Sequence, residues 1–236
     1  MTAEEIVARL LYRDGLMLII DKPAGYAVHR GPKGGRSLED HFEALRFGLP
    51  RNPALAHRLD RDTTGCLVLG RHRKALAALG KLFKAGRVDK TYWAVVEGGP
   101  AEDSGRIDLP LARRDATRCW WMKVDPEGQP AVTEYSVLGR ADGLTWLALH
   151  PLTGRTHQLR VHCAERGWPI VGDAIYGRRE SSGETAAAPA LHLHAREIVV
   201  PLSKNKPPVT ALAPAPLHMQ ERLYACGWTG EVFTLV

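Results

Sequence analysis

The most informative stretch of the chain covers residues 56–70 and reads A-H-R-L-D-R-D-T-T-G-C-L-V-L-G. Charge crowds its first half, because Asp60 stands between Arg58 and Arg61. Its second half, residues 66–69, is a continuous apolar run of the kind that forms a buried strand. The T-T-G between the two halves has the small, permissive residues of a turn. The stretch therefore predicts a charged loop held at the start of a buried strand.

Two interpretations of the charged half are open from the residues alone. Positive charge on both sides favours the ionised form of a carboxylate, and an ionised Asp60 suits a nucleophile or a general base rather than a general acid. The alternative is a surface ion-pair cluster at the mouth of a strand, which contributes little to stability by itself.

The positive charge of the chain is concentrated around Asp60. The whole sequence has a net charge of +6, whereas residues 51–90 hold ten Lys or Arg against three Asp or Glu, a local net charge of +7. A concentrated positive field beside a candidate active site favours a polyanionic substrate.

Composition places the chain among globular proteins. Of 236 residues, 44% are apolar and 25% are charged, which is enough to build a sizeable core. The sequence has no apolar run of membrane-spanning length, and its N-terminus is unlike a signal or transit peptide. The four cysteines are widely separated, without C-x-x-C, so we expect reduced thiols and a cytoplasmic protein with no membrane contact.

Hydrophobic periodicity and turn residues predict an alternation of helices and strands. We expect helices at residues 2–12 (with a Thr2 and Glu5 capping box), 37–47, 73–86, 156–167 (capped by Thr156) and 216–225. We expect strands at residues 16–20, 87–97, 106–109, 117–124, 131–138, 144–150 and 191–200, a turn at 21–25 and a loop at 178–189. No linker divides the chain convincingly, so we expect a single domain over residues 1–236.

Several kinds of site are disfavoured. His157 with His162, His162 with Cys163, and His192 with His194 lack the H-E-x-x-H spacing, and no cysteine pair supports structural zinc. The chain has no G-x-S-x-G, no G-x-G-x-x-G and no phosphate-binding G-x-x-x-x-G-K-[ST]. We therefore expect no metal and no cofactor.

Four segments together resemble the RluA type of RNA pseudouridine synthase. H-R-L-D-R-D-T-T-G is similar to the family's central H-R-L-D-R-x-T-S-G, with Thr64 in place of the usual serine. D-K-P-A-G-Y-A-V-H from Asp21 resembles D-K-P-x-G-x-x-V-H, and K-T-Y from Lys90 resembles K-x-Y. T-G-R-T-H-Q-L-R-V-H from Thr153, followed by G-W-P-I-V-G-D and Y-G, resembles the last motif. The matches follow the family's order and cover about residues 18–200.

The resemblance implies roles for individual residues. In the family, the aspartate matching Asp60 is essential for catalysis, the arginine matching Arg155 ion-pairs with it, and the tyrosine matching Tyr92 stacks on the target base. Together with the local charge, the resemblance predicts RNA-binding residues at Arg58, His57, Arg61, Leu159, Lys81, Lys84, Arg87 and Lys90. The D-K-P motif buttresses the catalytic loop in the family, and here we expect Asp21 and Lys22 to form a turn pair.

The fold implied by the resemblance is α+β: a bent, mainly antiparallel mixed sheet flanked by helices and loops, with a central RNA-binding cleft. The implied activity is isomerisation of uridine to pseudouridine in rRNA or tRNA, and we expect the protein to be a monomer. Because the first motif begins near Leu18, we expect no appended RNA-binding domain and a stem-loop as substrate. The alternative is a noncatalytic RNA-binding protein, but binding alone does not require Asp60, Tyr92 and Arg155 together.

Overall fold

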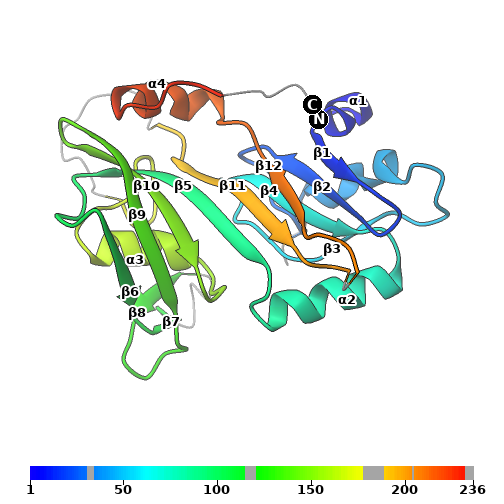
Figure 1. Ribbon diagram of the computed structural model, residues 1–236, viewed down its shortest axis with the longest axis horizontal. Coiled ribbons are helices and arrows are strands. Elements are labelled where there is room, and N and C mark those ends of the chain that lie inside the picture. Colours follow the sequence, from blue (N-terminus) through cyan, green and yellow to red (C-terminus); the bar gives the residue numbers. More distant parts are fainter. Residues whose placement is uncertain (31–34, 115–120, 178–188, 204, 232–236) are drawn as a thin grey trace. The chain divides into compact units, whose positions relative to one another are not determined.

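The computed structural model describes residues 1–30, 35–114, 121–177, 189–203 and 205–231, and the chain divides into two compact units (Figure 1). The first unit comprises Met1–Lys90 and Ala195–Pro214, and the second comprises Thr91–His194 and Ala215–Val236. Strands β5 (Asp89–Glu97) and β11 (Leu193–Val200) contribute residues to both units. The single domain expected from the sequence stays a prediction.

The first unit is built on strands in the order β1-β2-β4-β11, with β3 paired to β4 and β12 paired to β11. Their bounds are β1 Leu10–Arg13, β2 Met17–Lys22, β3 Ala54–Leu55, β4 Thr64–Gly70 and β12 Val209–Leu212. All residues of β4 are buried, as the apolar run predicts. The antiparallel pairing of β2 and β4 sets Lys22 opposite Gly65, at the end of β4 where the Asp60 loop arrives.

The helices of the first unit are α1 (Ala3–Val7), the 3-10 helix η1 (Leu38–Leu45) and α2 (Arg73–Lys84). The Thr2 and Glu5 capping box is confirmed, and Ile6 is buried. The predicted extension of this helix to residue 12 is wrong. Leu10 begins β1, whose residues pair with β2. Strand pairing outweighs helix periodicity there, because it satisfies the backbone groups and covers an edge of β2.

The second unit has the strand order β5-β10-β9-β6, and the pairs β5–β10, β10–β9 and β9–β6 are antiparallel. The bounds are β6 Ser104–Asp108, β9 Val132–Ala141 and β10 Leu144–Pro151. The predicted strands of this region are confirmed at these places. A separate two-stranded sheet pairs β7 (Leu111–Arg113), which periodicity missed, with β8 (Met122–Val124). Much of the strand expected at residues 117–124 lies outside the described residues.

Helices α3 (Gln158–Glu165) and α4 (Leu217–Ala225) cover opposite faces of β5 and β10 (Figure 1). Side chains alternate along a strand. Ala94 and Val96 of β5 therefore share a core with Leu159 and Cys163 of α3. Val95 instead shares a core with Met219 and Leu223 of α4.

The predicted start of one of these two helices is confirmed, and that of the other is wrong. The start of α4 after Pro216 is confirmed. The predicted cap at Thr156 is wrong, because the N-cap of α3 is His157, with a left-handed φ of 53°. The loop expected at residues 178–189 lies almost wholly outside the described residues. Within the described part of the chain, no helix is long and apolar enough to cross a membrane.

Candidate functional site

Asp60 lies in the loop between β3 and β4 of the first unit and is half-buried. Leu59 and Thr63 on either side of it are buried, whereas Arg58 and Arg61 are exposed. Two buried side chains therefore anchor a short loop that carries the candidate carboxylate between exposed arginines.

Lys22 holds this loop from beneath. Its side chain is fully buried, and its Nζ donates to the carbonyl oxygens of Pro23 and Arg61 at 2.8 Å and of Thr63 at 2.9 Å. These bonds occupy the three N–H donors of an ammonium group. Burial lowers the pKa of Lys22 to about 8, although the carboxylates of Asp62 and Asp60 raise it. The ammonium therefore stays charged at neutral pH and places a positive charge under the loop.

This position corrects the sequence interpretation of Asp21 and Lys22. They end strand β2 and do not form a turn pair; the turn starts at Ala24. The buttressing role implied by the resemblance agrees with the three hydrogen bonds of Lys22. The signal was a lysine at the end of a predicted buried strand, two residues after Ile20, since such a side chain must find acceptors if it is buried.

Gly65 explains why the T-T-G join needs a glycine. Its φ is +102°, and a Cβ at this position would collide with the backbone of Ala195 in β11. Any other residue would be strained here and would push the start of β4 away from β11. The loop that carries Asp60 therefore ends where the backbone of Gly65 lies close to the backbone of Ala195.

Arg61 and His57 contact the protein as well as being candidate RNA contacts. The Arg61 Nε donates to the carbonyl of Gly25 at 3.2 Å and lies 3.7 Å from a carboxylate oxygen of Asp62. His57 accepts a hydrogen bond from the Val68 N–H at 3.0 Å and stacks on Phe83. Burial, with a smaller effect of Lys90, lowers the pKa of His57 to about 3. Any RNA contact of His57 would therefore use a neutral ring.

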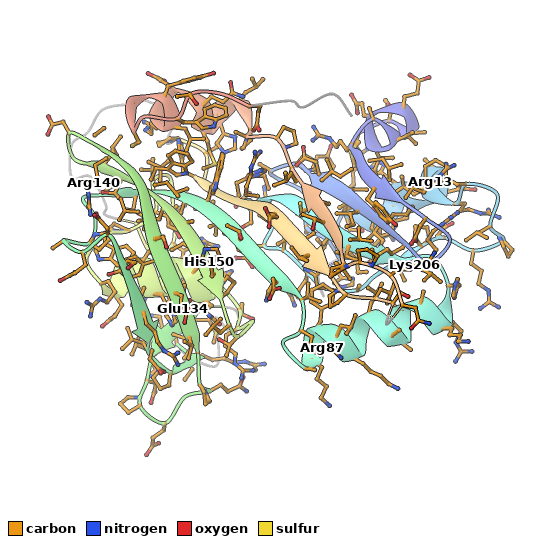
Figure 2. The ribbon with its side chains drawn as sticks, in the orientation of Figure 1. Arg13, Arg87, Glu134, Arg140, His150 and Lys206 are labelled. Atoms are coloured by element: carbon orange, nitrogen blue, oxygen red, sulfur yellow. The ribbon has the colours of Figure 1, made fainter. Side chains whose placement is uncertain are left out.

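The predicted basic contacts after the loop lie on and beyond α2. Lys81 and Lys84 occupy its last turn, and both are exposed. Arg87 follows the helix and also projects outward (Figure 2). The sequence has no acidic residue between Asp62 and Asp89, so this run has no carboxylate neighbour along the chain. Lys90 is half-buried, and burial lowers its pKa while Asp89 raises it.

Arg155 lies in the second unit, in the loop between β10 and α3, and is exposed. Its Nε donates to the carbonyl of Pro130 at 3.0 Å, and its backbone N–H donates to Oε1 of Gln158 at 3.0 Å. The first bond uses only Nε, so the terminal nitrogens of the guanidinium carry the donors suited to a carboxylate or phosphate.

Tyr92 lies on β5, opposite Leu149 of β10, and packs at the edge of the core that contains Leu159. Leu159 itself is buried, as expected for a packed position of α3. Its predicted role as an RNA-binding residue stays a prediction. The expected contact between Asp60 and Arg155 joins residues of different units and also stays a prediction.

A buried ion pair organises the rest of the last motif. Arg160 donates through Nε and Nη2 to the two carboxylate oxygens of Asp173 at 2.8 and 2.7 Å. Asp173 also accepts from the amides of Ile175 and Tyr176, and these contacts lower its pKa despite burial. The second arginine of R-T-H-Q-L-R and the aspartate of V-G-D therefore serve structure.

A bound metal ion needs several titratable side chains grouped around it. Among the residues that the structure describes, no group of three or more His, Cys, Asp or Glu is arranged to hold an ion. Cys66, Cys163 and Cys226 are free and buried, and burial raises the pKa of the Cys66 thiol to about 12.

Lys22→Met is expected to lower the free energy of unfolding by about 2 kcal/mol. The variant leaves the carbonyls of Pro23, Arg61 and Thr63 without their donor, and relief of the buried charge offsets this loss only in part. Denaturant unfolding measures the change, with exposed Lys74→Met as the matched control, expected to stay within about 0.5 kcal/mol. Equal unfolding midpoints for the two variants would contradict the anchoring role.

Comparisons with known proteins agree on one family. The family model described as RNA pseudouridylate synthase matches residues 16–165. An uncharacterized RNA pseudouridine synthase of Zymomonas mobilis is 44% identical over 213 residues, covering 89% of this chain and 95% of its own. The ribosomal large subunit pseudouridine synthase C of Vibrio cholerae is 37% identical, covering 91% of this chain and 68% of its own.

Solved structures agree with the sequence relatives. Human RNA pseudouridylate synthase domain containing 4 superposes with a TM-score of 0.78 at 26% identity, over 95% of both chains. Human RNA pseudouridylate synthase domain containing 1 superposes with a TM-score of 0.73 at 26% identity, over 99% of both chains. The predicted α+β fold class is confirmed by these matches.

Proposed function

This chain belongs to the RNA pseudouridylate synthase family and is an RNA uridine isomerase, and we propose that Asp60 is its essential catalytic residue. The observation that carries the proposal is the loop of the half-buried Asp60, whose backbone carbonyls at Arg61 and Thr63 accept hydrogen bonds from the charged Lys22 ammonium. Fixed positive charge and backbone anchoring keep a carboxylate oriented without reorganisation during the reaction.

The reaction needs no oxidant or energy source. The N1–C1′ bond of uridine breaks and a C5–C1′ bond forms, while C5 loses a proton and N1 gains one. One ionised carboxylate is chemically adequate for this exchange, either as a nucleophile that adds to the substrate or as the base that takes the C5 proton. We propose that the reaction requires neither a metal nor a cofactor.

We assign supporting roles to residues that match the family's motifs. Arg155 offers a planar pair of donors that suits a carboxylate, and Tyr92 offers an aromatic face for an extruded uracil. Leu159 borders the same base, and Arg58 helps to unstack it. His57, Arg61 and Lys90, with the basic residues of and after α2, contact the RNA around it.

The experiment that tests the activity follows from the bonds exchanged. RNA labelled with tritium at uridine C5 should release one tritium to water for each pseudouridine formed, since that position becomes the new glycosidic carbon. Release with the purified protein, without metal or cofactor, supports the proposal. RNA binding without release would favour the noncatalytic alternative.

We propose a stem-loop of ribosomal RNA as the substrate, because a relative that shares most of this chain is named a ribosomal large subunit synthase. Base edges and faces are most accessible in unpaired loops. Labelled fragments of large-subunit rRNA and whole tRNAs, tested side by side, distinguish the two substrate classes. Modification of intact ribosomal particles alone would refute the stem-loop proposal.

We also propose that the enzyme acts as a monomer in the cytoplasm. The three cysteines that the structure describes are free and buried, in keeping with a reducing compartment. Sedimentation at the concentrations of the activity assay tests the monomer, and cell fractionation tests the compartment. A dimer at those concentrations, or activity confined to a membrane or organelle fraction, would contradict this proposal.

RNA binding is expected to weaken with salt, in a way that depends on Lys81, Lys84 and Arg87. Each phosphate contact releases counterions, so replacing all three residues by Gln should flatten the log–log salt slope by about 2. The matched control replaces Arg30, Arg106 and Lys123, which are exposed and ion-paired with aspartates. Salt titrations of binding measure both slopes, and an equal change in the two triple variants would rule out a special role for this stretch.

A further inference from the structure

Gln158 is the first residue of α3 and is buried, although it follows the exposed loop that carries Arg155. We propose that Gln158 is a positioning residue for the isomerisation: oriented by Thr133 and His162, its side chain fixes the backbone of Arg155 and thereby aims the guanidinium. This inference rests on the proposed role of Arg155 in the reaction.

The side-chain amide of Gln158 uses its full hydrogen-bonding capacity. Its Oε1 accepts from the Arg155 N–H at 3.0 Å and from the Thr153 hydroxyl at 2.7 Å. Its Nε2 donates to the carbonyl of Val132 at 2.9 Å and to Oγ1 of Thr133 at 3.0 Å. Gln158 therefore ties the loop at the end of β10 to the start of β9.

His162 supports the orientation of this amide, which the Val132 carbonyl and the Arg155 N–H also require. His162 lies one turn further along α3, and its Nε2 lies 3.0 Å from the carbonyl of Leu109. A carbonyl only accepts, so Nε2 carries the hydrogen. Burial lowers the pKa of His162, so its Nδ1 is left as an acceptor for the Thr133 hydroxyl at 3.0 Å. Thr133 must then accept from Nε2 of Gln158, which turns Oε1 towards Arg155.

Arg155 is held at two points by the same short stretch of chain. Its backbone is fixed through Gln158 to Val132 and Thr133, and its Nε is fixed directly to Pro130. The Thr153 hydroxyl, which also bonds to Gln158, accepts from the Val132 N–H at 2.9 Å. An arginine anchored at both its amide and its Nε has little freedom in where its terminal nitrogens point. Such support matters because misplacement of a reacting group by 1 Å can cost about 10²-fold in rate.

The test compares Gln158→Met and Thr133→Val with the wild-type enzyme. Both changes nearly preserve size but remove hydrogen bonds of the network. Gln158→Met is expected to lower the single-turnover rate by about 10- to 100-fold while RNA affinity changes by less than about twofold. Thr133→Val should change the rate in the same direction, by less. The matched control is Gln220→Met in α4, whose amide donates to the Ala215 carbonyl, and its rate should equal that of wild type.

Combining Gln158→Met with Arg155→Lys distinguishes a positioning role of Gln158 from a purely structural one. If Gln158 acts through Arg155, adding Gln158→Met to Arg155→Lys should cost less than about twofold more. The same fold loss in both backgrounds would overturn the inference. A wild-type rate for Arg155→Lys itself would instead refute the proposed role of Arg155 and leave the hydrogen-bond network as a structural feature.

Amide hydrogen exchange of Arg155 supplies a measurement independent of activity, which decides the case if the Arg155→Lys rate is too low to follow. The Arg155 amide should exchange faster in Gln158→Met and in Thr133→Val than in wild type, with no change in Gln220→Met. Unchanged exchange in Gln158→Met would overturn the inference, because the proposed anchor would then not hold this amide.

Discussion

Asp60→Asn is expected to reduce pseudouridine formation by at least about 10⁴-fold, the scale of loss when an essential catalytic group is removed. Asparagine preserves the size of the side chain and removes its charge. The loop should keep its shape, because Lys22 holds it through the backbone carbonyls of Arg61 and Thr63. RNA affinity should therefore stay within a fewfold of wild type.

Tritium release from C5-labelled RNA, with enzyme in excess over RNA, measures the effect on the first turnover. Asp62→Asn is the matched control. Asp62 is an exposed carboxylate of the same loop, paired with Arg61, and its loss should leave the rate within about threefold. Near-normal release by Asp60→Asn would remove the catalytic assignment and favour the noncatalytic RNA-binding interpretation.

Arg155→Lys is expected to lower the single-turnover rate by at least about 100-fold without unfolding the protein. Lysine keeps the positive charge but loses the planar pair of donors and the Nε that bonds to Pro130. Loss of one such oriented donor costs about 10²–10³ in rate where it stabilises a transition state. Arg166→Lys, at the other end of α3 and exposed, should change the rate by less than about twofold.

The proposed cooperation of Arg155 with Asp60 has its own measurement. Asp60→Glu keeps the charge and displaces it, so some activity should remain for comparison. The double variant Asp60→Glu/Arg155→Lys should lose much less than the product of the two single losses, since residues that act as one unit are not additive. Multiplicative losses would show that the two residues act independently.

Local patterns were sufficient for much of the fold. The short apolar runs that form β2 and β4 are bounded by turn residues and buried, as their local pattern predicts. The Thr2 and Glu5 capping box and the start of α4 after Pro216 also depend on neighbouring residues alone. The charged loop before β4 and the concentration of basic residues around it could also be predicted, because both depend on residues that are close in sequence.

The sequence failed where distant pairing decides the outcome. Leu10 follows a helical pattern but joins β1, because β2 offers it backbone partners. Lys22 resembles a turn residue until two of its three acceptors, 39 and 41 positions away, are brought within hydrogen-bonding distance by the pairing of β2 with β4. A buried ammonium is stable only with such acceptors, and the residues next to Lys22 in sequence do not predict them.

The sequence by itself determined which family motifs are present, where the Asp60 loop lies and which residues are expected around it, since these depend on residue identity and short spacings. Only the tertiary structure decided what holds them. Gln158 reaches Thr133 because β9 and β10 pair with Thr133 opposite Pro151, and α3 then packs its first turn against that pairing. Directed hydrogen bonds between buried groups need this three-dimensional register, because each donor must meet its acceptor within about 3 Å.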